Sequence, residues 1–147
     1  MMCRILVATA LVITTFAIGP ADASGGDWPM YRHDAARSGY TDETLAAELS
    51  LAWRYDSGAP PQRAWPRSQK QRFDECFQPI VSEGRVYFGS SVDCKLYCLD
   101  AASGETIWTY FTGGPIRFAP VAWKGRVAVA SDDGFLHVVD SATGEQQ

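Results

Sequence analysis

Thiols, imidazoles and paired carboxylates are the side chains that bind metals or act as nucleophiles, and this sequence has few of them. The thiols and imidazoles are Cys3, Cys76, Cys94, Cys98, His33 and His137, and the adjacent acidic residues include Asp132–Asp133. No two cysteines form a Cys-x-x-Cys pattern, with two residues between them. No cysteine and histidine have the spacing of a zinc ligand set. The acidic pair precedes Gly134 but lacks the spaced oxygen ligands of a calcium loop. The pattern predicts no metal site and a plain turn at residues 132–134.

The sequence also lacks the residue combinations that are typical of catalytic sites. No serine, histidine and aspartate share a supporting spacing, no pair of carboxylates stands out for acid–base work, and no glycine-rich phosphate loop is present. His137 stands where an earlier, similar stretch has Tyr97, which favours a packing role over ligation. We therefore expect no catalytic, cofactor-binding or metal-binding residue in these 147 positions.

A long basic segment at residues 57–75 is the one candidate for ligand binding. Its cations are Arg63, Arg67, Lys70 and Arg72, and Trp65 stands among them. These side chains suit an anionic ligand or a polysaccharide stacked on the indole ring. A solvated insertion without a ligand is the favoured alternative, because long loops are often simply exposed connections.

The cysteines permit at most one internal disulfide once Cys3 is set aside. Cys94 and Cys98 lie about 13 Å apart if the chain between them is extended, which is too far for a disulfide. Cys76 with Cys94 is the better candidate, and three free thiols remain the favoured alternative.

The first 23 residues are typical of a secretory signal peptide. Arg4 precedes an apolar run over 5–18, and Ala21–Asp22–Ala23 forms a cleavage site. The run is shorter than the roughly 20 residues that span a membrane, so export with cleavage is preferred over a membrane anchor. We expect a periplasmic or extracellular protein with no membrane span after cleavage. The formal net charge of −4 is spread along the chain and argues against a nucleic-acid partner.

A repeat of 40 to 41 residues organises the rest. Residues 79–108 align with residues 120–147, and the recurring positions include Pro79/Pro120, Gly84/Gly125, Ser90/Ser131, Leu96/Leu136, Asp100/Asp140 and Gly104/Gly144. Valine, isoleucine and aromatic residues between turn signals predict short strands. In the first copy we expect strands at 79–82, 85–90, 95–100 and 105–111. Asp100 and Gly104 predict a capped turn between the last two strands, with no catalytic role.

These stretches carry a family resemblance. "LYCLDAASGETIW" at 96–108 resembles the repeat of pyrroloquinoline-quinone-type (PQQ-like) β-propellers, and "GRVYFGSS" at 84–91 and "GRVAVASDDG" at 125–134 resemble its second strand and following loop. "DWPMYRHDAARSGYT" at 27–41 resembles the lead-in of such propellers in exported bacterial proteins. The resemblance implies an all-β fold whose blades each have four antiparallel strands.

The resemblance also implies a layout. We expect a signal peptide at 1–23, a lead-in at 24–49, an isolated strand at 50–56 that completes a last blade, the basic loop at 57–75, blade one at 76–112 and a truncated blade two at 115–147. About two blades cannot close a ring of four to eight, so we interpret the chain as the N-terminal fragment of a longer propeller. Four loops should share one face, at 57–75, 91–94, 112–117 and 132–134, with the 101–104 turn on the opposite face.

Two functions fit this fold. The first is an exported, non-catalytic interaction scaffold that contacts a protein partner or the remaining blades, similar to the outer-membrane assembly lipoprotein. The alternative is a fragment of a quinoprotein dehydrogenase that uses quinone and calcium. The resemblance to those enzymes implies an adjacent Cys–Cys pair, which this sequence lacks. We therefore expect a scaffold and no enzymatic activity.

Overall fold

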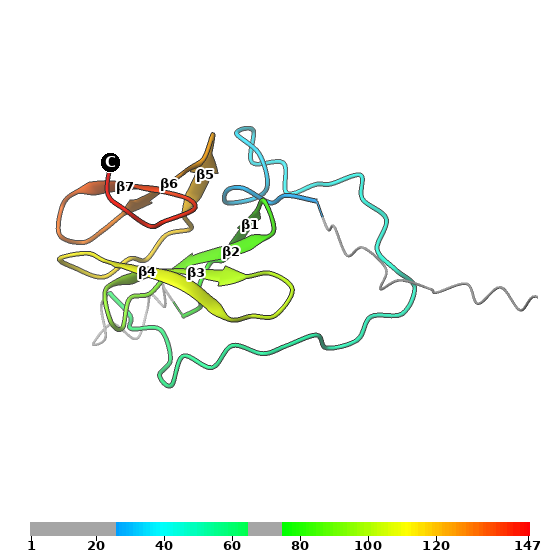
Figure 1. Ribbon diagram of the computed structural model, residues 1–147, viewed down its shortest axis with the longest axis horizontal. Helices are drawn as coiled ribbons and strands as arrows, with labels where there is room; N and C mark the ends of the chain where they lie inside the picture. Colours follow the sequence, from blue (N-terminus) through cyan, green and yellow to red (C-terminus); the bar gives the residue numbers. More distant parts are fainter. Residues whose placement is uncertain (1–25, 65–74) are drawn as a thin grey trace, which may run out of the picture.

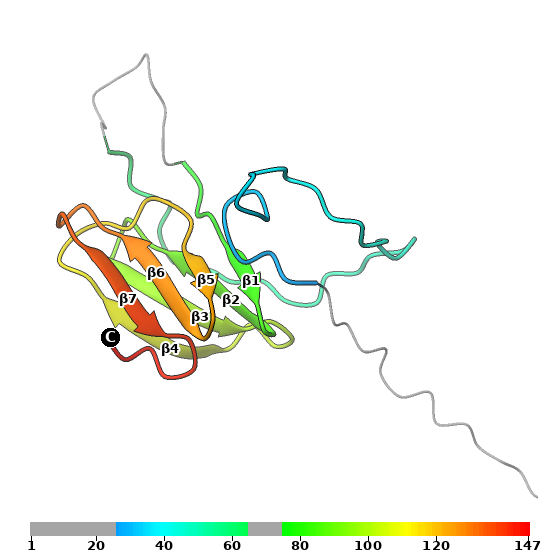
Figure 2. The ribbon, with the colours of Figure 1, turned by 90° about the horizontal axis from the view of Figure 1, so that it is seen from above.

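The computed structural model describes residues 26–64 and 75–147, and within them every regular element is a β-strand. Two antiparallel sheets stack face to face (Figures 1 and 2). The strands are β1 (Ile80–Ser82), β2 (Arg85–Gly89), β3 (Lys95–Asp100), β4 (Thr106–Phe111), β5 (Val121–Trp123), β6 (Arg126–Ala130) and β7 (Leu136–Asp140). They begin and end at or next to the residues that the repeat predicts, so the all-β prediction is confirmed.

Each sheet is built from strands that are neighbours in sequence. The first has the order β1-β2-β3-β4 and the second β5-β6-β7. A fourth strand begins beside β7, where Val139 pairs with Gln146 and the Gln147 N–H donates to the Val138 carbonyl at 2.9 Å. Both sheets are therefore propeller blades with the same meander.

Tight two-residue turns close the first hairpin of each blade. Glu83 and Gly84 have φ of 50° and 71°, and Lys124 and Gly125 have φ of 47° and 72°. Positive φ at both central positions matches the right-handed twist of the flanking strands. The glycine makes this conformation accessible without steric strain. The same turn in both repeats sets the same register in both sheets.

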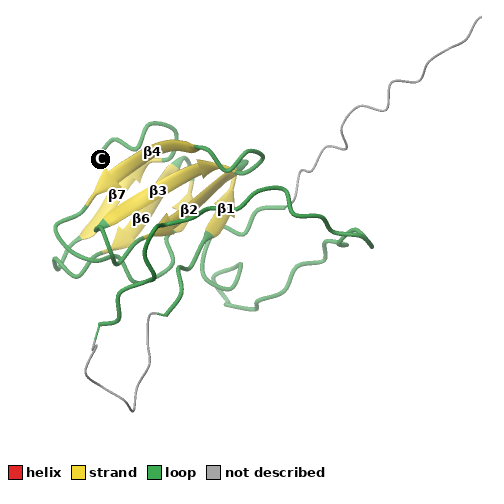
Figure 3. Cartoon of the chain, turned by 90° about the horizontal axis from the view of Figure 1, so that it is seen from below, coloured by secondary structure: helices red, strands yellow, loops and turns green. Residues whose placement is uncertain are grey.

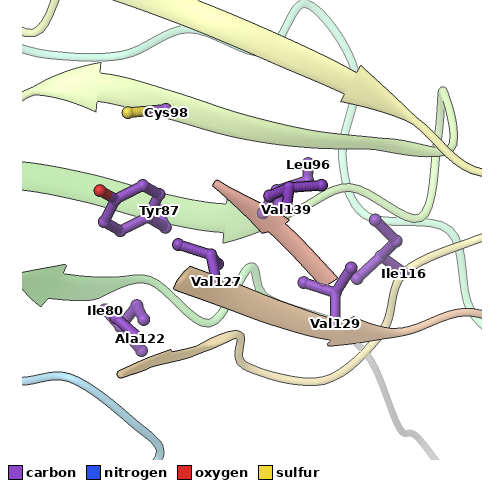
Figure 4. Close-up of a cluster of buried hydrophobic side chains, with 9 residues drawn as sticks. All are labelled: Ile80, Tyr87, Leu96, Cys98, Ile116, Ala122, Val127, Val129 and Val139. Atoms are coloured by element: carbon purple, nitrogen blue, oxygen red, sulfur yellow. The ribbon is translucent and has the colours of Figure 1, made fainter. Parts of the chain in front are cut away.

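The core lies between the two sheets (Figure 4). The first sheet and the connection after it contribute Ile80, Tyr87, Leu96, Cys98 and Ile116, and the second contributes Ala122, Val127, Val129 and Val139. The first sheet supplies most of the larger side chains and the second sheet smaller ones, three valines and an alanine, which lets the layers interdigitate at high packing density. This interface fixes how the loops of the two blades meet.

The N-terminal segment follows the edges of β1 and β5. Trp28 and Val81 exchange backbone hydrogen bonds at 2.7 and 3.0 Å, and the Ala122 N–H donates to the Pro29 carbonyl at 2.8 Å. One short stretch therefore joins both blades along the first strand of each, in addition to their shared core.

Residues 50–56, which were expected to complete a last blade, form no strand with the two described blades. Figure 3 draws this stretch as loop, and none of the described strands pairs with it. A strand requires a hydrogen-bonded ladder, so apolar sequence alone does not make one. The segment still lies against the first blade, since the Tyr55 ring packs edge-on against Phe88 at 5.1 Å between centroids.

Candidate functional site

The loops predicted to share one face meet there. The Gln62 N–H donates to Ser91 Oγ at 2.8 Å, and Arg117 donates from Nη1 to the Gln62 carbonyl at 2.6 Å and from Nε to Asp132 Oδ2 at 2.6 Å. Arg117 keeps only 11% of its side chain exposed. It comes from the connection between the blades and holds a loop on either side of it. We call this end of the two blades the loop face.

Asp133 is the most constrained carboxylate of the loop face. It accepts hydrogen bonds from the Gly113 N–H at 2.8 Å, the Phe135 N–H at 3.0 Å and His137 Nε2 at 2.9 Å. Burial raises the pKa of Asp133, but hydrogen bonds from Phe135, His137, Gly113 and Ser131 outweigh it and lower the pKa to about 2. The carboxylate therefore stays ionised and joins the loop of blade two to the connection between the blades.

His137 completes this cluster. Its Nε2 faces Asp133, and its Nδ1 lies 3.0 Å from the Tyr110 hydroxyl. A neutral imidazole that donates from Nε2 accepts at Nδ1, so the Tyr110 hydroxyl is the donor in that tautomer. Both ring nitrogens of His137 therefore lie against protein groups.

Blade one has a related cluster at the same place. Tyr97, the counterpart of His137, donates its hydroxyl to Asp93, and Lys95 Nζ lies 3.2 Å from the same carboxylate oxygen. Burial and the hydrogen bond to Asp93 raise the pKa of the Tyr97 hydroxyl. Tyr55 packs edge-on against Tyr97, as Tyr110 does against His137. In both blades an aspartate of the loop orients a ring of the third strand.

The opposite end of the blades has the predicted capped turns. Asp100 Oδ1 accepts from the backbone N–H groups of Ala102 and Ser103 at 3.0 and 2.8 Å, and Asp140 does the same in blade two. These hydrogen bonds to Ser103 and Thr143 lower the pKa of each carboxylate. The structural role predicted for Asp100 is confirmed.

The sequence analysis did not predict that a tryptophan side chain packs on each of these turns. Trp53 donates from Nε1 to the Ala101 carbonyl at 2.9 Å, and Trp108 donates to the Ser141 carbonyl at 3.1 Å. A Cβ added to Gly104 would lie 2.5 Å from the Trp53 ring, and one added to Gly144 would lie 2.7 Å from the Trp108 ring. Each indole therefore docks on the turn of a blade to which its own segment does not belong. The signal in the sequence was the likeness of "SLAWRY" at 50–55 to "ETIWTY" at 105–110, since each places a tryptophan ahead of a later glycine turn.

The remaining chemical candidates stay apart. Cys76 is exposed, Cys94 is partly buried and Cys98 is buried, and all three are free thiols. Arg63 pairs with Glu75 at 2.5 Å. The other basic side chains of the 57–75 loop, together with Trp65, lie outside the described residues, as does the predicted signal peptide.

Two features are absent from residues 26–64 and 75–147. No group of three or more histidine, cysteine or carboxylate side chains there is placed to hold a metal ion. No helix in these ranges is long and apolar enough to cross a membrane.

The repeated antiparallel meander, with four strands in the first sheet and three in the second and with the two sheets stacked face to face, defines a partial β-propeller built from PQQ-like repeats. A model of PQQ repeats, described as "Outer membrane protein assembly factor BamB", matches residues 46–147. The chain therefore belongs to this PQQ-repeat family.

Individual relatives include enzymes. The quinohemoprotein alcohol dehydrogenase of Comamonas testosteroni is 30% identical over 82% of this chain and 17% of its own length. A cytochrome c-linked 1-butanol dehydrogenase of Thauera butanivorans is 27% identical over 97% of this chain and 20% of its own length. The solved Comamonas testosteroni enzyme superposes with a TM-score of 0.63 at 24% identity over 84% of this chain and 19% of that structure, which shows a shared fold.

The chain thus spans about a fifth or less of the length of these relatives. An outer membrane assembly factor BamB from Francisella salina is 34% identical over 41% of the chain and 12% of its own length. The expectation of a scaffold without enzymatic activity is contradicted, because relatives matched over most of the chain are alcohol dehydrogenases. The error arose because the expectation relied on the absence of a Cys–Cys pair within two blades.

Proposed function

We propose that this chain forms two adjacent blades of the propeller of a quinoprotein alcohol dehydrogenase. One observation carries the proposal, namely how far each similarity extends along the chain. The matches to dehydrogenases cover 82% and 97% of it, whereas the match to a BamB protein covers 41%. The longer matches extend beyond the repeat pattern that many propellers share.

The described residues do not fit the quinone and calcium of such an enzyme. Two acidic side chains of the loop face are already occupied, since Asp132 pairs with Arg117, and Asp133 accepts three N–H donors. Cys94 and Cys98 are separated by three residues and do not form an adjacent pair. In this proposal the redox group is held by other blades, and no chemical step is assigned to these two.

The role of the chain is then to position a wall of the site. Arg117 and Asp133 each cross from one loop to another, so the connection between the blades cannot shift without breaking charge-assisted hydrogen bonds. On the opposite end, Trp53 and Trp108 link successive segments. Such cross-links hold loops rigid enough to present a ligand to reacting groups elsewhere in a ring.

Export belongs to the same proposal. The predicted signal peptide at 1–23 would deliver the protein to the periplasm or the exterior. Neighbouring blades are the protein partners that this arrangement requires.

The direct test uses the protein produced from its complete reading frame. It is incubated with pyrroloquinoline quinone and calcium chloride, and reduction of an artificial electron acceptor is followed with ethanol and with 1-butanol. We expect alcohol-dependent reduction that requires the quinone and is lost when a chelator is present during loading. The matched control omits only the quinone.

Folding is verified separately by circular dichroism and size-exclusion chromatography. A folded protein that binds no quinone by absorbance and reduces no acceptor with either alcohol contradicts the proposal. Quinone binding without turnover of these two alcohols contradicts the alcohol assignment and leaves the quinoprotein class intact.

A further inference from the structure

A pocket of about 490 Å³ lies beside the start of β5, away from the tryptophan-docked turns. The N-terminal segment forms one wall, and the residues that lead into β1 and β5 form the other. Its lining residues are Tyr31, Arg37, Gln78, Phe118, Ala119 and Val121. None of these residues belongs to the Asp133 cluster or to the Trp53 and Trp108 docking contacts.

The segment that presents Arg37 is held in one conformation. Asp34 accepts hydrogen bonds from the Ser38 N–H at 2.9 Å and from Ser38 Oγ at 2.6 Å. The Gly39 N–H donates to the Arg32 carbonyl at 2.9 Å and the Arg37 N–H to the Asp34 carbonyl at 2.9 Å. Arg37 itself has a left-handed backbone with φ of 56°, which costs a non-glycine residue about 1–2 kcal/mol. The loop therefore aims this side chain at the pocket despite local strain.

The positive charge in the pocket, on Arg37, has no directly bonded partner among the described residues. Over residues 26–64 and 75–147 the Arg37 guanidinium has no hydrogen bond or ion pair. Asp34, which lines an adjoining hollow with Arg37, is engaged by Ser38. Those two hydrogen bonds lower the pKa of Asp34 and keep it anionic, so it reduces the net positive field without forming a salt bridge to Arg37.

Two aromatic rings flank this cation. Tyr31 is 53% exposed and Phe118 is 67% exposed, although both are large side chains that gain from burial. Gln78 is fixed at the pocket rim, because its Oε1 accepts the Ala119 N–H at 3.2 Å. The pocket thus combines one forked cationic donor with apolar rings and a fixed amide.

We propose that this pocket binds a small aromatic carboxylate. A guanidinium offers two parallel N–H donors that match the two oxygens of a carboxylate, and Tyr31 and Phe118 supply surfaces against which a flat ring packs. An inorganic anion would leave both rings exposed, and a neutral aromatic would leave the guanidinium unpaired. The inference goes beyond the dehydrogenase proposal and does not depend on it.

The test uses benzoate as the probe and the full 147-residue chain as the protein. Saturation-transfer NMR measures the dissociation constant of benzoate and of the neutral analogue benzamide. We expect benzoate to bind, and benzamide and the Arg37→Gln variant each to show about tenfold weaker binding, as the loss of a hydrogen bond to a charged group implies. The matched control is Arg32→Gln, which removes the same charge from a left-handed residue of the same loop, and it should bind benzoate as the parent does.

A second variant separates ring packing from charge. Phe118→Ala should weaken benzoate and benzamide by the same factor, because it removes an apolar surface and no charge. Circular dichroism establishes that each variant keeps the β spectrum of the parent. The proposal is overturned if benzoate does not bind, if Arg32→Gln weakens it as much as Arg37→Gln does, or if Phe118→Ala has no effect.

Discussion

Leu96 and Leu136 occupy the same place in the two repeats, yet Leu96 is fully buried and Leu136 is 69% exposed. The same contrast separates Ile80, which is 1% exposed, from its counterpart Val121, which is 39% exposed. In blade one this face packs against blade two, whereas none of the described residues forms a further sheet against the matching face of blade two. Burial is therefore set by the neighbouring sheet and not by the repeat itself.

The two blades also differ at the loop face, although the third strand of each has a ring that contacts an aspartate. Tyr97 and His137 both contact an aspartate four residues earlier, but only His137 presents two hydrogen-bonding nitrogens. It therefore bridges Asp133 to Tyr110 of β4 in blade one, where blade one itself uses Lys95 as the additional partner of Asp93. Equivalent positions can thus keep their geometry while one blade gains a cross-blade hydrogen bond.

The difference in burial between Leu96 and Leu136 is tested most directly by truncating each of them. Leu96→Ala should lower the free energy of unfolding by about 2–5 kcal/mol, because it opens a cavity between the sheets. Leu136→Ala, the matched control, should change it by no more than about 0.5 kcal/mol at an exposed site. Urea unfolding followed by tryptophan fluorescence measures both. Equal effects would show that the two faces are buried alike in solution.

The docked tryptophans are tested through their glycines. Gly144→Ala should destabilise the protein by about 1–3 kcal/mol more than Gly125→Ala, because it adds overpacking to backbone strain. Both glycines have positive φ, at 74° and 72°, but only the Cβ at position 144 meets an indole ring. The same denaturation series measures the difference, and equal losses for the two variants would contradict a docked Trp108.

The Asp133 cluster makes a prediction about pH. Because the pKa of Asp133 falls from 3.8 to about 2 on folding, the ionised group stabilises the native state above pH 3.8, and this contribution is lost as the pH falls towards 2. Asp133→Asn should therefore flatten the pH dependence of the unfolding free energy between about pH 4 and 2. Unfolding measured at several acidic pH values tests this, and an unchanged slope would be the contrary result.

The last prediction concerns thiol reactivity, which reports how deeply each cysteine is buried and not how stable the protein is. Burial raises the pKa of Cys98 to about 11, so its reactive thiolate is scarce at neutral pH. Iodoacetamide should label exposed Cys76 first, partly buried Cys94 more slowly, and Cys98 only after unfolding. Peptide mass spectrometry follows the order. A Cys76–Cys94 disulfide would instead protect both residues until a reductant is added.

Much of the local structure was predictable from particular residues. Asp100 with Gly104 and Asp140 with Gly144 predicted the capped turns, because aspartate accepts nearby N–H donors and glycine tolerates positive φ. The valine, isoleucine and aromatic residues between turn signals predicted the strands. The segment at 50–56 stays a prediction, because the blade that it is expected to complete is not among the described residues.

The candidate site was less accessible to sequence reasoning. The gathering of the loops on one face was predicted, but the pairing of Arg117 with Gln62 and Asp132 was not. The pocket at Arg37 joins residues 31 and 37 to residues 118–121. No periodicity links positions so far apart, and only the packing of the N-terminal segment on both blades brings them together.

The sequence by itself determined the blade, its hairpin turns and its repeat, because these depend on side-chain alternation and on local backbone preferences. The tertiary structure decided which face of each blade is buried, where Trp53 and Trp108 dock, and which charges meet across loops. These contacts join residues tens of positions apart, and their geometry exists only once two sheets have stacked.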